Sequence, residues 1–218
     1  MSRIFCIGRN YVEHVRELSN VVPQKPVVFM KPFSCLVKPG DSIRFPAHGR
    51  DLQHETEVVI RIGRVGRVAA GEGALSWIDA VTIGLDLTLR DVQDELKKRG
   101  LPWEKSKAFE QSAPIGAFVP CNGSLDLNEL VFGCRVNGVQ RQAGSTRDMI
   151  FSFEALLMEL SGIWALKPGD LVFTGTPSGV GSLVVGDTVE IYGEGIGAFS
   201  WKIVEGSQYP CHPELVEG

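Results

Sequence analysis

Glycine and proline recur along the whole chain and limit how far any helix or strand can run. The 218 residues include 25 glycines and 12 prolines, spread from one end to the other. Glycine weakens the interior of a helix or strand, and proline removes a backbone donor, so these residues divide the chain into many short segments. The pattern predicts a strand-rich α+β fold with only a few short helices.

Eight segments have the β-branched, apolar or alternating character of strands. They are Pro26 to Met30, Ser42 to Phe45, Thr56 to Val65, Ala80 to Leu87, Leu130 to Val136, Asp170 to Thr174, Thr188 to Ile191 and Ala198 to Val204. The segment from Met1 to Cys6 also reads as a short strand that enters Gly8. Asn137-Gly138 predicts a tight hairpin turn directly after Val136, because both residues tolerate a left-handed backbone.

Three segments are expected to be helices: Tyr11 to Leu18, Leu89 to Arg99, and Phe151 to Gly162. For the second helix we expect Thr88 as the N-cap and Asp91 in a capping-box position. Gly100 and Pro102 should end it. We expect one catalytic domain over residues 1–207, followed by a weakly structured tail at 208–218.

Composition and charge exclude several classes of function. The net charge of −4 is mild and the basic residues are scattered, so no surface for nucleic acid is expected. No apolar run is long enough to cross a bilayer, and no secretory signal is visible, so we expect a cytosolic protein without a membrane partner. The five cysteines, at wide and irregular spacing, favour free thiols over disulfides or a thiolate zinc site.

The segment His54-Glu55-Thr56-Glu57 is the first that indicates a functional site. Side chains alternate along a strand, so Glu55 and Glu57 should share one face. An isolated Glu-x-Glu is more often acidic decoration on a solvent-facing edge strand. Two like charges on one face nevertheless repel each other, and a hard divalent cation would offset that repulsion.

Asp86 interrupts an otherwise apolar strand, and a buried carboxylate is costly unless it is paired or binds a cation. One interpretation pairs Asp86 with Arg90. The other combines it with Glu55 and Glu57 in an all-oxygen site, which suits Mg²⁺ or Mn²⁺ better than Zn²⁺.

His14 and Glu17 are three residues apart on an expected helix, so Glu17 could orient the imidazole and the pair could take a proton from water. The common alternative for this pattern is a solvated helix surface. Arg3, Arg9 and Asn10 lie close to it in sequence and could attract an anion.

Two further features are ambiguous in the sequence. Lys107 follows Pro102-Trp103 and is interpreted equally well as a surface lysine. The small residues from Thr174 to Gly181 follow an expected strand, and their amides with the Thr176 hydroxyl could hold a carboxylate. A tight structural turn is the alternative, and the ending of a phosphate-binding Walker loop is missing.

These motifs occur in an order that resembles the fumarylacetoacetate hydrolase family, most closely its short acylpyruvate hydrolase branch. The resemblance covers about Arg3 to Val204 and rests on Gly8-Arg9-Asn10-Tyr11 with His14 and Glu17, Phe29-Met30-Lys31-Pro32, His54-Glu55-Thr56-Glu57, Leu85-Asp86, Arg90-Asp91-Val92-Gln93, Lys107 and Thr174-Gly175-Thr176-Pro177.

The resemblance implies a mixed β-sandwich or β-roll, typically a homodimer, with a lid helix at residues 10–18. It implies that Glu55, Glu57 and Asp86 bind Mg²⁺ or Mn²⁺. His14, Glu17 and Lys107 match the catalytic positions. Arg90, Gln93 and Thr176 match positions that contact substrate, and Arg9 is our further candidate for substrate binding.

The expected substrate is a small 2-oxo acid. A cation on the three carboxylates would polarise the ketone and stabilise an enolate. We expect hydrolysis of the C–C bond of acylpyruvates to pyruvate and a carboxylic acid, with oxaloacetate decarboxylase activity. The alternative is an isomerase, decarboxylase or oxaloacetate keto-enol tautomerase that acts on 2-oxo dicarboxylic acids.

Overall fold

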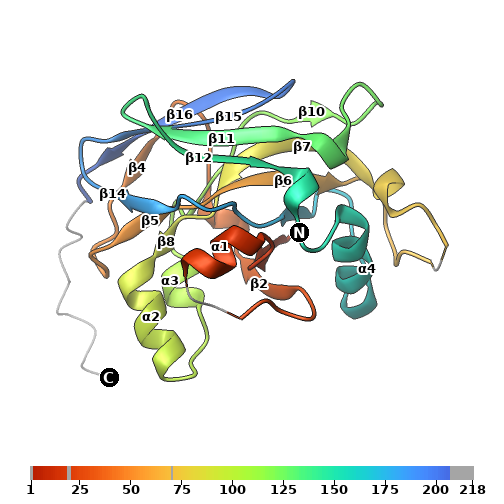
Figure 1. Cartoon of the computed structure of the whole chain (residues 1–218), viewed down its shortest axis with the longest axis horizontal. Helices are drawn as coiled ribbons and strands as arrows, with labels where there is room; N and C mark the ends of the chain where they lie inside the picture. Colours follow the sequence, from red (N-terminus) through yellow and green to blue (C-terminus); the bar gives the residue numbers. More distant parts are fainter. Residues whose placement is uncertain (1, 19–20, 70, 207–218) are drawn as a thin grey trace, which may run out of the picture.

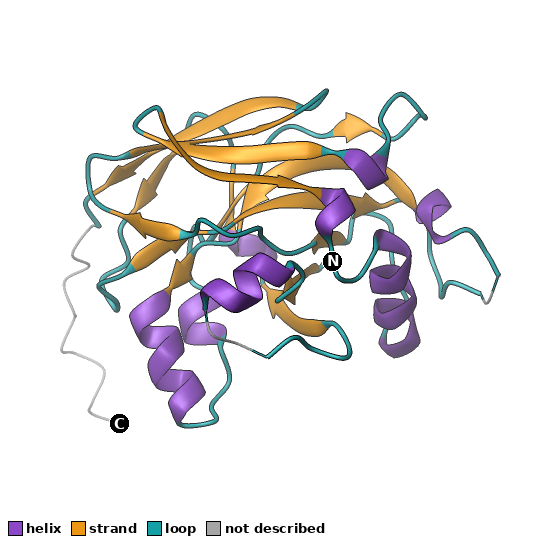
Figure 2. Cartoon of the chain, in the orientation of Figure 1, coloured by secondary structure: helices purple, strands orange, loops and turns teal. Residues whose placement is uncertain are grey.

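The structure is a computed structural model that describes residues 2–18, 21–69 and 71–206. Strands form most of its regular secondary structure, and short helices lie at the periphery (Figures 1 and 2). The expected strand-rich fold with few helices is confirmed. The tail expected at 208–218, together with Cys211, lies outside the described residues. Within the described part of the chain, no helix is both long and apolar enough to cross a membrane.

The largest sheet has six strands in the order β10-β7-β6-β13-β1-β2. Their bounds are β1 Ile4–Gly8, β2 Val27–Lys31, β6 Thr56–Ile62, β7 Ile78–Leu85, β10 Val119–Pro120 and β13 Leu171–Phe173. All neighbours are antiparallel except β1 and β13, which are parallel. The two long inner strands β6 and β7 are almost wholly buried, which explains their continuous apolar runs.

A five-stranded sheet in the order β12-β11-β15-β16-β4 packs against the first one, with β15 over β7 and β11 over β6. Its strands are β4 Ser42–Arg44, β11 Val131–Val136, β12 Val139–Ser145, β15 Thr188–Gly193 and β16 Gly197–Val204. The sheets approach closely at Gly193, where an added Cβ would lie 2.8 Å from the Ile83 side chain. Buried apolar side chains from both sheets form the core, each contributing roughly 1.5–3 kcal/mol.

Two small sheets complete the strand content. One has the order β14-β5-β8, and the other pairs β3 with β9. Their bounds are β3 Leu36–Val37, β5 Leu52–His54, β8 Thr88–Leu89, β9 Ala113–Pro114 and β14 Gly181–Leu183. None of these short strands was predicted. Two or three residues are too few to show a periodic pattern.

The helices are α1 Val12–Glu17, α2 Arg90–Lys98, α3 Glu104–Lys107 and α4 Phe153–Ile163. Single 3-10 turns lie at Phe33–Cys35, Ala74–Trp77, Leu127–Glu129 and Thr146–Asp148. In Figure 1, α1, α2 and α3 gather on the same side of the strands, and α4 lies apart from them. The three predicted helices are therefore present, whereas α3 was missed because it is a single turn.

The predicted hairpin and helix stop are confirmed. Asn137 and Gly138 have φ values of 51° and 77°, and they join β11 to β12. Gly100 adopts φ 62° directly after α2, as expected for a glycine that ends a helix. The eight predicted strands all occur, although the third ends at Ile62 rather than Val65.

The predicted N-cap of α2 is wrong. Leu89 occupies that position, and no side chain caps it. Thr88 is paired instead with Gln53 in the small sheet, and its hydroxyl donates to the Asp86 carbonyl oxygen. The Asp91 carboxylate accepts backbone N–H bonds from Arg50 and Asp51. Contacts with residues distant in the sequence therefore replace the expected capping bonds.

Candidate active site

Three carboxylates converge where β6 and β7 meet. The antiparallel register pairs Thr56 with Leu85, and the Asp86 N–H donates to the Glu55 carbonyl oxygen over 2.8 Å. One oxygen each of Glu55, Glu57 and Asp86 lies within 4.8 Å of the others. All three side chains are buried, and β6 lies inside the sheet. The alternative of acidic decoration on a solvent-facing edge strand is therefore wrong.

Three buried cations surround these carboxylates. The Lys107 ammonium donates to Glu55 over 2.8 Å, to Asp86 over 2.6 Å and to the Thr88 hydroxyl over 2.6 Å. Arg90 donates to the other Glu55 oxygen. The surface-lysine interpretation of Lys107 is thus wrong, and Asp86 does not pair with Arg90.

Lys31 is the third cation, and the sequence analysis gave it no role. Its ammonium lies 2.9 Å from Asp86 Oδ1 and is fully enclosed. It also donates to the backbone carbonyl oxygens of Leu87, Lys107 and Ser112. Lys31 therefore ties the segment after β7 to the segment around α3. Nothing in the local sequence distinguishes it from a surface lysine.

Glu57 differs from the other two carboxylates, because no cation among the described residues donates a hydrogen bond to it. Its side chain accepts the Gly175 N–H over 2.8 Å. Burial, followed by the nearby Asp86 and Glu55 charges, raises the pKa of Glu57 well above its ordinary value. Burial also acts to raise the pKa of Glu55, but Lys107 and Arg90 outweigh it and hold that pKa below the ordinary value.

The residues fit a hard divalent cation. Asp86 Oδ1 has no hydrogen-bond donor in the described structure, although the Lys31 charge is close. A cation would offset both the burial and the repulsion from Asp86 and Glu55 that raise the pKa of Glu57, and carboxylate oxygens are the ligands that Mg²⁺ and Mn²⁺ prefer. The donor set contains no thiolate or imidazole, which argues against zinc.

His14 and Glu17 are in contact, as predicted. His14 Nδ1 lies 3.3 Å from Glu17 Oε2, and the imidazole is buried at the pocket. Glu17 Oε1 accepts the Gly179 N–H over 3.0 Å, which ties α1 to the loop after β13. Burial lowers the pKa of His14 despite the Glu55 and Glu17 charges, so the neutral imidazole predominates near neutral pH. The solvated-surface alternative is wrong for His14.

The loop from Thr174 to Gly181 mainly supports the carboxylates. Its Gly175 amide, which we considered for a substrate carboxylate, is bonded to Glu57 instead. The Thr176 hydroxyl lines the pocket, but it donates to the Thr56 carbonyl oxygen and accepts from Gln142. Gln142 also contacts His54 over 3.0 Å. Neither Gln142 nor His54 was predicted, because only the folded chain brings them together.

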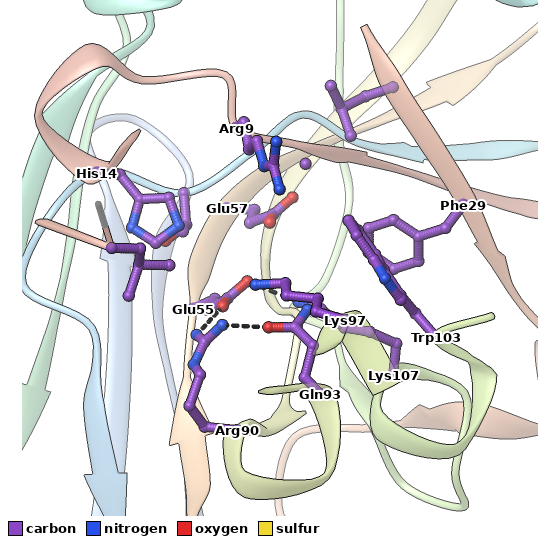
Figure 3. Close-up of a pocket in the computed structure, with 14 residues that line it drawn as sticks. Arg9, His14, Phe29, Glu55, Glu57, Arg90, Gln93, Lys97, Trp103 and Lys107 are labelled. Atoms are coloured by element: carbon purple, nitrogen blue, oxygen red, sulfur yellow. Dashed lines mark hydrogen bonds and ion pairs between the residues drawn. The ribbon is translucent and has the colours of Figure 1, made fainter. Parts of the chain in front are cut away.

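The pocket above the carboxylates is lined by most of the predicted site residues. Figure 3 shows His14 on one side of the glutamates, and Phe29 and Trp103 on the other. Gln93 accepts from Arg90 and lies on the same helix. The full lining is Ile7, Gly8, Arg9, His14, Leu18, Phe29, Glu55, Glu57, Arg90, Gln93, Lys97, Trp103, Lys107 and Thr176.

Of the three residues expected to attract an anion, only Arg9 lines this pocket. Arg3 pairs with Asp170 over 2.5 Å. Asn10 is buried, and its side chain bonds to the backbone of Phe151 and Thr174. The sequence analysis missed Lys97, although it lies seven residues after Arg90 and four after Gln93. That helical spacing places the three on one face of α2.

Comparison with known proteins gives a consistent set of relatives. Residues 3–204 match the family model for the fumarylacetoacetate (FAA) hydrolase C-terminal region. The chain is 41% identical over 206 residues to oxaloacetate tautomerase FAHD1, mitochondrial, of Rattus norvegicus, covering 94% of this chain and 93% of the relative.

Two solved structures extend the comparison. Fumarylpyruvate hydrolase from Pseudomonas aeruginosa, in complex with Mn²⁺ and pyruvate, superposes with a TM-score of 0.90 at 33% identity, covering 94% of this chain and 91% of that one. The 5-carboxymethyl-2-hydroxymuconate delta-isomerase from Mycobacterium smegmatis superposes with a TM-score of 0.83 at 34% identity, covering 95% of this chain and 80% of that one. The similar proteins thus include a tautomerase, a hydrolase and an isomerase.

Proposed function

Because the chain belongs to the fumarylacetoacetate hydrolase family, we propose that it is a divalent-metal-dependent enzyme that acts on small 2-oxo acids through their enolates. Keto-enol tautomerisation of oxaloacetate is its first activity. The observation that carries this proposal is the buried group of Glu55, Glu57 and Asp86, with ligand oxygens within 4.8 Å of one another beside a buried His14. The name of the rat relative supports the choice of oxaloacetate.

Glu55, Glu57 and Asp86 would hold Mg²⁺ or Mn²⁺. When bound, the cation would supply positive charge that polarises a 2-oxo group and stabilises its enolate. The Mn²⁺ and pyruvate in the Pseudomonas structure support a divalent ion in this family. The charge balance supports an anionic substrate, because the three cations that pair with Glu55 and Asp86 equal the three carboxylates in number, so a bound divalent cation would leave the site positively charged.

His14 is the proton carrier of the proposed reaction. As a neutral imidazole held by Glu17, it can remove a proton from C3 of oxaloacetate and return one to the 2-oxygen, which completes the conversion of ketone to enol. Lys107 remains charged, because Asp86 and Glu55 raise its pKa against the effect of burial. It therefore offers positive charge near the developing enolate. Arg90, Gln93 and Thr176 would orient the substrate.

A second candidate is hydrolysis of acylpyruvates, with decarboxylation of oxaloacetate as a further activity. The observation that favours hydrolysis is the contact between His14 and Glu17, since such a pair can also take a proton from water. Hydroxide would add to the 4-oxo carbon, and the C3–C4 bond would break with its electrons passing to C3. Protonation then gives pyruvate and a carboxylic acid. The name of the Pseudomonas structure supports this alternative.

Substrate assays with and without chelator test the proposal. Purified protein with Mg²⁺ should accelerate the interconversion of enol and keto oxaloacetate, followed by the enol absorbance, and EDTA should abolish the effect. Acetylpyruvate is assayed in parallel for release of acetate and pyruvate. Absence of Mg²⁺-dependent turnover on either acid would overturn the proposal. Turnover of acetylpyruvate alone would make hydrolysis the first activity.

His14→Ala separates the reactions that need a proton carrier from the one that does not. We expect tautomerisation and hydrolysis to fall by about 100-fold or more, since general base catalysis contributes at least that much. Decarboxylation of oxaloacetate should stay within about 10-fold, because loss of CO₂ needs no proton removal from carbon or water. The measurement is kcat for each reaction at saturating Mg²⁺.

His48→Ala is the matched control, since His48 is exposed and lies outside the pocket. It should leave all three rates unchanged. If His14→Ala retains tautomerisation and hydrolysis within about threefold of the parent rates, His14 is not the proton carrier.

Three expectations stay predictions. They are the homodimer, the cytosolic location and the lid-like movement of residues 10–18. The measured mass in solution and the solvent protection of α1 with and without substrate would test the first and the last.

A further inference from the structure

Two cations line the pocket without an ion pair among the described residues. Arg9 and Lys97 make no hydrogen bond or ion pair through their side chains in the described structure. Every other cation of the pocket is matched, since Arg90 and Lys107 are paired with Glu55 or Asp86. The pocket therefore has two positive charges beyond those that its own carboxylates require.

Arg9 is held in place by its neighbours rather than by its side chain. Its backbone has φ 62°, a left-handed conformation that costs energy for any residue with a side chain. The next residue, Asn10, fixes this conformation through two side-chain bonds donated to the carbonyl oxygens of Thr174 and Phe151, and one accepted from the Phe151 N–H. Figure 3 shows Arg9 among the side chains that line the pocket, between His14 and Phe29 in this view. Strain maintained in this way is typical of functional positions.

Lys97 approaches the same space from α2. Its ammonium lies 5.7 Å from the centre of the Trp103 ring, within the range of a cation–π interaction, and Trp103 also lines the pocket. Burial, the Arg90 charge and, more weakly, the Arg9 charge lower the pKa of Lys97, and they outweigh the opposing charges of Asp94 and Glu55. A half-buried ammonium among other cations is unfavourable by itself, and a bound anion would relieve that cost. Phe29 packs edge-on against Trp103 at 5.9 Å and closes this side of the pocket.

We propose that Arg9 and Lys97 form a second anion subsite that binds the distal carboxylate of a dicarboxylic 2-oxo acid, with Lys97 as a specificity-determining residue. This inference rests on the proposed function, because the 2-oxo acid end of the substrate is assigned to the three carboxylates and their cation. The subsite makes the enzyme prefer substrates with two carboxylates, such as oxaloacetate, over 2-oxo acids of similar size that end in an apolar group.

The test measures binding rather than turnover. Calorimetry on the Mg²⁺-loaded protein measures the Kd of two stable acids. 2-Oxoglutarate has a carboxylate at its distal end, whereas 2-oxohexanoate has an apolar ethyl group in the same place. Charged hydrogen bonds of this kind change affinity by roughly 10-fold or more. We expect the parent to bind 2-oxoglutarate at least that much more tightly, and Lys97→Met to lose this preference while its Kd for 2-oxohexanoate stays unchanged.

Lys98→Met is the matched control, because Lys98 is the exposed neighbour on the same helix and lies outside the pocket. It should keep the preference of the parent. If the parent binds both acids equally, or if Lys97→Met weakens both equally, the subsite is wrong while the proposed function stands. If the Mg²⁺-loaded parent binds neither acid, the subsite is wrong, and the turnover assays with oxaloacetate and acetylpyruvate decide the proposed function separately.

Discussion

Asp86→Asn is expected to lower Mg²⁺-dependent turnover of oxaloacetate by about 1,000-fold or more. Loss of one charged ligand weakens the cation site, and the cation is assigned most of the enolate stabilisation, which amounts to several kcal/mol. Asparagine keeps the size of the side chain, so the change tests charge rather than shape. The measurement is kcat/KM across a range of Mg²⁺ concentrations.

Asp79→Asn is the control for this substitution. Asp79 lies on the same strand, β7, but is exposed and paired with Arg61. It should retain the parent activity. Because Asp86→Asn also removes a partner from Lys107 and Lys31, the fold of the variant is checked by circular dichroism. A folded Asp86→Asn enzyme with activity within 10-fold of the parent would show that Asp86 does not hold an essential cation.

Lys31→Met is expected to destabilise the protein by about 3–5 kcal/mol, because it leaves a buried carboxylate without one of its cations. The Lys31 side chain is fully buried, and its ammonium pairs with Asp86 and donates to three backbone carbonyl oxygens. Methionine fills similar space but cannot donate a hydrogen bond. The measurement is the free energy of unfolding from urea denaturation.

The matched control is Lys38→Met, since Lys38 is exposed and none of its side-chain atoms forms an ion pair in the described structure. A change below about 0.5 kcal/mol is expected there. A loss of less than about 1 kcal/mol for Lys31→Met would mean that Lys31 does not stabilise the segments around the site.

The fold was predictable where the signal is local. Asn137-Gly138 specifies its turn through backbone conformation alone, and Gly100 ends α2 for the same reason. The alternation around Glu57 and the apolar run before Asp86 identified the inner strands β6 and β7. The predicted capping box at Thr88 is wrong, because Thr88 pairs with Gln53 of β5 and its hydroxyl donates to the Asp86 carbonyl oxygen.

The site was predictable only in part, because the lysines that pair with its carboxylates come from distant segments of the chain. Glu55 and Glu57 reveal their shared face within three residues. Lys107 has no local signal, and it was placed in the site by resemblance alone. Lys31 is 55 residues away from its partner Asp86 and looks like any other lysine in the sequence.

Lys97 is the residue that the sequence could have revealed. Its spacing from Arg90 and Gln93 is helical, so the expected helix already placed all three on one face. What the sequence does not contain is the direction of that face, which is fixed when α2 packs beside α3.

The most direct test of the account is the position of Mn²⁺ in crystals of the protein soaked with that ion, located by anomalous diffraction. We expect one strong peak per chain at the meeting point of β6 and β7, within about 2.0–2.3 Å of one oxygen each of Glu55, Glu57 and Asp86. A fully soaked crystal with no peak there, in which Glu55 and Asp86 keep their ion pairs with Lys107, Arg90 and Lys31, would contradict the assignment of these carboxylates as the metal ligands.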